Sequence, residues 1–222
     1  MTQQPALIDL SGSFFQEIEC FSEVWEALET LTMPDSQRRR QGMEQLLELE
    51  VARVSPLVAY VMATRLTDPD IGIRFRVVQA IGEILMPIDA TKKPTEAVLQ
   101  TIKEYLAQWR SRPIFGLLQV AVQYPPAETH IATIFNYCSF AGSTLADIFI
   151  DRRHPVEIRR QAIFFVGRVG FLDTIPALER LIDRLSGRLK GQRKMPFAPP
   201  PRPDEETLLV VAQTALALLK SS

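Results

Sequence analysis

The chain has 222 residues, of which 46% are hydrophobic and 23% are charged, a composition typical of a folded domain and not of an intrinsically disordered chain. It carries 25 Lys and Arg against 26 Asp and Glu, a net charge of −1, which argues against bulk affinity for nucleic acid. Two separated cysteines, Cys20 and Cys138, exclude a disulfide framework, and no apolar run reaches the roughly 18 residues of a membrane span, so we expect a cytoplasmic protein.

Apolar residues recur at helical spacing along most of the chain, and the strict alternation typical of strands is scarce, so we predict an all-α fold. Prolines such as Pro56, Pro155 and Pro203 stand where a helix can begin, because the first helical turn does not need the missing N–H. The predicted helices are 15–31, 34–50, 55–66, 69–86, 94–110, 113–123, 127–138, 141–151, 155–169, 174–189 and 203–220.

Residues 1–33 form an N-terminal segment that precedes the other predicted helices. Within it, 15–31 is amphipathic, with apolar residues such as Phe21, Val24 and Leu28 on one side and glutamates on the other. Because the open end of a stacked array must be covered, we predict a capping helix here. Docking of a partner helix is the alternative.

One motif recurs among the later helices. An arginine follows the first of three apolar or small residues spaced four apart, and a glycine follows the last. One copy consists of Ile158, Arg159, Ala162, Val166 and Gly167, and the other, 85 residues earlier, consists of Ile73, Arg74, Val77, Ile81 and Gly82. The offset is about two units of 42 residues. Looser copies occur near Arg39 and Leu208, and the segment from Pro113 occupies the place of a copy without its arginine and final glycine.

This motif predicts stacked pairs of helices. Small residues such as Gly42 and Ala162 let a neighbouring helix approach closely. Gly82 and Gly167, placed at the end of their helices, relax the helix or help the chain turn. Because one pair of helices cannot bury its own apolar face, the pairs must stack on one another.

The stretch from His154 to Gly167, continued from Pro176 to Ile182, resembles a HEAT repeat, and the stretch from Asp68 to Gly82 is similar. The resemblance implies a right-handed α-α superhelix, a HEAT/ARM-like solenoid of about five helix pairs, with 34–222 as the repeat array and one structural domain overall. It also implies that the motif arginine pairs with an acidic residue at a turn, a part that Asp68 or Asp151 could play. HEAT repeats mostly serve as scaffolds and binding surfaces.

Charge is unevenly distributed. Residues 1–150 carry a net charge of −6, and residues 151–203 carry +7. A basic, Pro-rich insertion at 186–203 lengthens the last repeat, and between Arg184 and Pro203 there are six basic residues and no acidic one. We predict that this insertion is the main interaction site, with a mobile connector as the alternative.

The predicted function is a non-catalytic protein-binding scaffold or assembly module. A groove formed by the second helices of successive pairs, 55–66, 94–110, 141–151 and 174–189, would hold a protein with an acidic surface. The candidate contacts are basic residues beside this groove and residues of the insertion: Arg110, Arg112, Arg152, Arg153, Arg184, Arg188, Arg193, Lys194 and Phe197.

We assign no catalytic, cofactor-binding or metal-ligating residue. His130 and His154 have no partner at metal-ligand spacing, and Cys138 lies among aromatic residues as a small buried hydrophobe. Two alternatives stay open. One is a HEAT-like DNA-binding enzyme of the alkylpurine glycosylase type, which Trp109, Arg110 and Arg112 superficially suit. The other is a helper of a cofactor-bearing protein, similar to the phycobilin lyases or a chaperone.

Overall fold

The computed structural model describes residues 21–87, 89–194 and 203–221, and this part of the chain is all-helical, without a strand. Its α-helices are α2 (Ser22–Thr32), α3 (Ser36–Glu48), α4 (Pro56–Thr64), α5 (Ile71–Leu85), α6 (Glu96–Ala107), α7 (Ser111–Gln123), α8 (Glu128–Phe135), α9 (Ala141–Ile150), α10 (Val156–Val169), α11 (Ile175–Lys194) and α12 (Pro203–Ser221). Short 3-10 turns occupy Val51–Arg53, Arg65–Thr67, Ala90–Lys92, Pro125–Ala127 and Leu172–Thr174. The predicted all-α class is confirmed.

Local signals in the sequence account for the starts of α3, α4, α5 and α6. The side chains of Asp35, Ser55, Asp70 and Thr95 each accept a hydrogen bond from a backbone N–H in the first turn of the helix that follows. These caps satisfy donors that have no partner within the helix. Pro56 is the first residue of α4, as its position in the sequence predicts.

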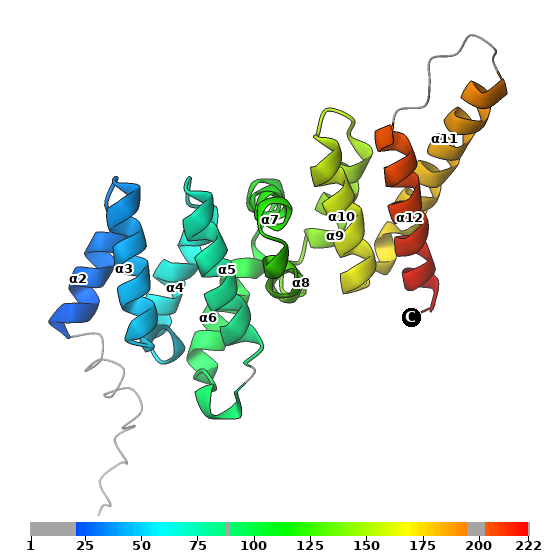
Figure 1. The fold of residues 1–222 in the computed structure, drawn as a ribbon. Helices are drawn as coiled ribbons and strands as arrows, with labels where there is room; N and C mark the ends of the chain where they lie inside the picture. The colour runs from blue at the N-terminus through cyan, green and yellow to red at the C-terminus, as the bar shows by residue number, and fades with distance from the viewer. Residues whose placement is uncertain (1–20, 88, 195–202, 222) are drawn as a thin grey trace, which may run out of the picture.

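The helices follow one another in chain order along a row, from α2 at one end to α11 and α12 at the other (Figure 1). Helix α3 packs on α5 and α10 packs on α12, while α4 packs on α6 and α9 packs on α11. One connected cluster of buried apolar side chains runs from Val24 on α2 to Leu219 on α12. The apolar faces of successive helices are therefore buried against their neighbours in the row.

Helices α7 and α8 interrupt this regularity. Both are seen nearly along their axes in Figure 1, whereas α3, α5, α10 and α12 are seen from the side. Helix α8 packs on α5, where His130 lies over Gly82. The different orientation coincides with the segment from Pro113 that lacks the arginine and the final glycine of the repeated motif.

The glycines of the repeated motif have a different role from the predicted one. Gly82 and Gly167 lie inside α5 and α10, and the chain turns after α10 at Gly170, whose φ is +91°. A Cβ atom on Gly167 would lie 2.8 Å from the Cα of Ala215 on α12. The motif glycine is therefore a contact point between helices, and the expected relaxed helix end is wrong.

The basic insertion is also shorter than predicted. Residues 186–194 continue α11 as a helix instead of beginning a loop at 186. Leu181, Leu185 and Leu189 follow at intervals of four residues and are all buried, so the apolar face of α11 extends into the predicted insertion. The remaining residues, 195–202, lie outside the part of the chain that the structure describes.

At the opposite end, α2 packs on α3 with Val24, Ala27, Leu28 and Leu31 buried between them. Phe21 and Trp25 remain exposed on its outer side. The first residues of the predicted helix 15–31, up to residue 20, are outside the described residues.

Candidate functional site: an arginine cluster

Four arginines come together where α9, α10, α11 and α12 meet. Arg152 lies in the turn between α9 and α10, Arg159 lies on the first turns of α10, and Arg184 and Arg188 lie one turn apart on α11. We call these four residues the arginine cluster. The packing of α10 against α9 and α12, and of α11 against α12, brings their helices together.

Arg159 is the fixed member of the arginine cluster. Arg159 is only 9% exposed to solvent, and its Nε donates a hydrogen bond to the carbonyl oxygen of Phe149 at 2.9 Å. Phe149 lies at the end of α9, where carbonyl groups have no partner within the helix. This bond uses Nε, so the Nη groups of Arg159 are not engaged by the Phe149 carbonyl.

Arg184 and Arg188 differ in how their charge is compensated. Arg188 Nη1 donates to Glu205 Oε1 at 3.0 Å, which links α11 to the first turn of α12. Arg184 forms no ion pair with any described carboxylate, and its buried Nε has no hydrogen-bond partner there. A buried N–H without an acceptor costs free energy, so Arg184 lowers the stability of the folded chain unless a group from outside the described residues compensates it.

The positive charges of the arginine cluster act on one another. Burial lowers the pKa of Arg159, and the nearby charges of Arg184 and Arg152 lower it further. The pKa of Arg184 is lowered by burial and then by Arg152 and Arg188. Glu205 and Asp151 oppose the effect on Arg159, but Asp151 is hydrogen-bonded to Arg153. The arginine cluster therefore holds like charges that its own carboxylates do not neutralise.

Three of the predicted contact residues, Arg152, Arg184 and Arg188, thus lie together. Arg153, next to Arg152, is bound to Asp151 through Nε at 3.0 Å and Nη2 at 2.7 Å. The side chains of Arg193 and Lys194, at the end of α11, and all of Phe197 are outside the described residues.

Arg110 and Arg112 lie elsewhere, at the start of α7. The guanidinium carbon of Arg110 lies 3.7 Å from the centre of the Phe140 ring, a cation–π contact. Arg112 is exposed and lines a pocket of about 310 Å³ together with Arg74, Asp68 and Gln119. Trp109 is buried and packs edge-on against Tyr105, so its ring is not available at the surface to stack on a base.

Arg159 was not predicted to be part of the site. Asp68 or Asp151 was expected to pair with the motif arginines Arg74 and Arg159, but neither of these arginines forms an ion pair with a described carboxylate. Asp68 forms an ion pair with Arg39 instead, and Arg74 donates to the carbonyl oxygen of Gly116 and to Gln119. The sequence signal for this site was the absence of Asp and Glu from Arg184 to Pro203, which leaves few nearby carboxylates to pair with the arginines.

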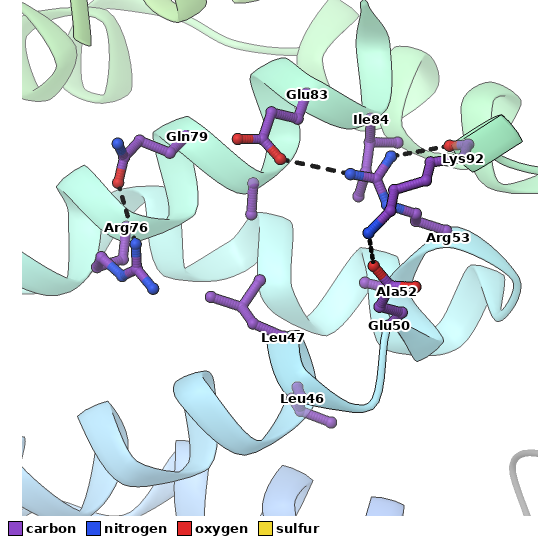
Figure 2. A pocket seen from close by; sticks show the side chains of 11 residues that line it. Leu46, Leu47, Glu50, Ala52, Arg53, Arg76, Gln79, Glu83, Ile84 and Lys92 are labelled. Carbon is purple, nitrogen blue, oxygen red and sulfur yellow. Dashed lines mark hydrogen bonds and ion pairs between the residues drawn. The ribbon is translucent and has the colours of Figure 1, made fainter. Parts of the chain in front are cut away.

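A second pocket, of about 320 Å³, lies between α3, α5 and the turns that follow them (Figure 2). Leu46, Leu47, Ala52, Ala80 and Ile84 supply its apolar wall. The charged side chains that line it are already paired: Arg53 with Glu83, Lys92 with Glu50, and Arg76 with Glu44 outside the lining. Figure 2 shows the first two of these pairs on one side of the pocket. The pocket therefore offers no uncompensated charge to a ligand.

The described residues contain no group of three or more His, Cys, Asp or Glu side chains that could hold a metal ion. None of the described helices is both long enough and apolar enough to cross a membrane. Burial raises the pKa of the Cys138 thiol to about 12, which makes it a poor nucleophile. No protein-family model, no curated protein and no solved structure matches this chain.

Proposed function

We propose that the protein is a non-catalytic binding scaffold, a HEAT-like solenoid of about five helix pairs that holds an acidic protein against the arginine cluster. Support for the architecture comes from the repeated motif and from the packing of first helices on first helices and second helices on second helices. A scaffold of this kind would work in the cytoplasm.

The observation that carries this proposal is the uncompensated charge of the arginine cluster. Arg152 and Arg184 have no hydrogen bond or ion pair to a carboxylate of the described chain, although the whole protein carries 26 acidic side chains. Maintaining such charges costs stability, and an acidic partner would recover that cost on binding. The excess of acidic residues in 1–150 would orient the partner toward the basic end.

The test is affinity capture from the source organism with charge-reversed variants. Arg152→Glu and Arg184→Glu should lose acidic proteins that the unmodified protein retains, and those proteins should elute as salt is raised. Arg180→Glu is the matched control, because Arg180 lies one turn before Arg184 on α11 and its Nε donates to Pro176 of the same helix. Thermal denaturation checks that all three variants are folded. Retention of the same proteins by all variants would contradict the proposal.

A further inference from the structure

The arginine cluster has more positive charge than a single carboxylate can compensate. Among the described residues, no carboxylate forms a hydrogen bond or ion pair with Arg152, Arg159 or Arg184. In the sequence, residues 190–202 contain no Asp or Glu. A carboxylate brings one negative charge and two oxygens, whereas a phosphate monoester brings nearly two charges and three strongly accepting oxygens.

The donors of the arginine cluster are also arranged before any ligand binds. Arg159 is held by its burial and by the bond from Nε to Phe149, so its Nη groups lose little conformational freedom when an anion arrives. Arg184 has no ion pair with a described carboxylate, and the nearby charges of Arg152 and Arg188 add to its own. Guanidinium groups match phosphate oxygens through paired hydrogen bonds.

From these features we infer that Arg152, Arg159 and Arg184 form a binding site for one phosphate group, presented on a phosphorylated serine or threonine of the protein partner. This inference rests on the proposed scaffold function and specifies the chemistry of the partner. Arg188 is already paired with Glu205, so it is not a principal ligand.

The surroundings favour a single phosphate over a nucleic-acid chain. Glu205, in the first turn of α12, contacts Arg188 directly, and the same turn also carries Asp204 and Glu206. A strand with a phosphate on every nucleotide would bring further negative charge close to these carboxylates. A peptide with one phosphorylated residue avoids this repulsion.

The experiment is a set of titrations of the full chain, followed through the Nε–H signals of arginine in NMR spectra. The probes are inorganic phosphate, a short Gly/Ala peptide with a central phosphoserine, the same peptide with glutamate in that place, and a single-stranded DNA decamer. We expect the phosphopeptide to move the signals of Arg159 and Arg184 and to bind about tenfold or more tightly than the glutamate peptide.

Variants then assign the binding to the named side chains. Arg184→Gln and Arg152→Gln should each weaken binding of the phosphopeptide about tenfold or more, because each removes hydrogen bonds between charged groups. Arg180→Gln, on the same helix but outside the arginine cluster, should leave the affinity unchanged. Equal effects of Arg180→Gln and Arg184→Gln would overturn the inference, as would equal affinity for the phosphoserine and glutamate peptides.

Two further outcomes would overturn the choice of ligand. Inorganic phosphate that binds as tightly as the phosphopeptide would assign the site to the free ion, and a DNA decamer that binds more tightly would assign it to nucleic acid. Phosphatase treatment of the captured partners separates this inference from the scaffold proposal. If capture depends on Arg184 but is unchanged by phosphatase, the scaffold proposal is supported and the phosphate-binding inference is rejected.

Discussion

Three arginines at the same position of the repeated motif make three different contacts. Arg39 forms a buried ion pair with Asp68 through two hydrogen bonds of 2.9 Å. Arg74 donates to the carbonyl oxygen of Gly116 at 3.2 Å, and Arg159 donates to that of Phe149 at 2.9 Å. Each arginine links its helix to another segment, but only Arg39 has its charge compensated by a buried carboxylate.

The ion pair of Arg39 with Asp68 should matter for stability. The two side chains are 8% and 1% exposed, and removal of one partner from a buried pair leaves the other charge buried and unpaired. We expect Asp68→Asn to lower the free energy of unfolding by about 3 kcal/mol or more, measured by urea denaturation.

Glu44→Gln is the control for this substitution. It breaks the ion pair with Arg76, in which both side chains are nearly half exposed. An exposed pair contributes less than about 1 kcal/mol because water and salt screen it. Similar losses for Asp68→Asn and Glu44→Gln would show that burial of the Arg39 pair has no energetic consequence.

Asp151 provides a test of the charge pattern beside the arginine cluster. The hydrogen bonds from the side chain and backbone of Arg153 lower the pKa of Asp151 from 3.8 to about 2. A lowered pKa means that the ionised carboxylate stabilises the folded state above about pH 4, and that this contribution is lost as the pH falls toward 2.

An NMR titration of the Asp151 carboxyl carbon measures this pKa directly. Arg153→Gln should move the midpoint upward, toward 3.8, because it removes the largest of the causes. A midpoint near 3.8 in the unmodified protein would contradict the hydrogen bonds from Arg153.

At the scale of elements, glycine sets the distance between helices. A Cβ atom on Gly42 of α3 would lie 2.6 Å from the carbonyl oxygen of Ala27 on α2, and one on Gly82 of α5 would lie 2.5 Å from the Cβ of His130 on α8. Gly167 of α10 approaches Ala215 of α12 in the same way. The close approach lets these helices bury their apolar faces against each other.

Alanine substitutions at two glycines should therefore have opposite effects. Gly167→Ala forces α10 away from α12 and should destabilise the protein by about 1–3 kcal/mol. Gly187, on α11, has nothing within 4 Å of the Cβ position, so Gly187→Ala should stabilise the protein by about 0.5–1 kcal/mol through the better helix propensity of alanine. Thermal denaturation of both variants checks the signs, and stabilisation by Gly167→Ala would contradict the observed packing.

At the scale of the whole molecule, the order of the helices along the row determines which parts can influence one another. Helix α2 packs on α3, and α10 packs on α12 at the opposite end. In an array of this kind each unit is stabilised mainly by its neighbours. A destabilising substitution at one end of the row should therefore lower the stability of the neighbouring helices only.

Leu31→Ala tests this expectation, because Leu31 is fully buried in α2. The loss of its side chain should cost about 2–5 kcal/mol locally. Native-state hydrogen exchange should show reduced protection of the amides in α2–α4 and little change in α10–α12. A uniform loss of protection in every helix would indicate a single cooperative globule and would contradict the proposed solenoid.

Much of the helical framework can be predicted from local sequence. Caps such as Asp70 and Thr95 mark helix starts because their side chains satisfy backbone donors of the next turn. The end of α11 was predicted at residue 189, whereas the helix reaches Lys194. Leu189 is the last apolar residue of this helix, so the apolar period gives no signal for the residues that follow it.

The candidate site was only partly predictable. Arg152, Arg184 and Arg188 were predicted as partner contacts because they lie in the basic part of the sequence. Arg159 belongs to the repeated motif, so an ion pair with an acidic residue of the same chain was predicted for it. Which carboxylate an arginine reaches depends on how neighbouring helices are placed, and Asp68 happens to face Arg39 and not Arg74. That placement cannot be derived from spacing along the chain.

The amino-acid sequence by itself determined that the chain forms successive amphipathic helices, because helix periodicity, caps and prolines act within a few residues. It also determined the excess of positive charge in 151–203. Only the tertiary structure decided that Arg159 joins Arg152 and Arg184, and that Gly167 contacts α12. These contacts join residues from different helices, so their geometry depends on how whole helices pack and not on local preferences.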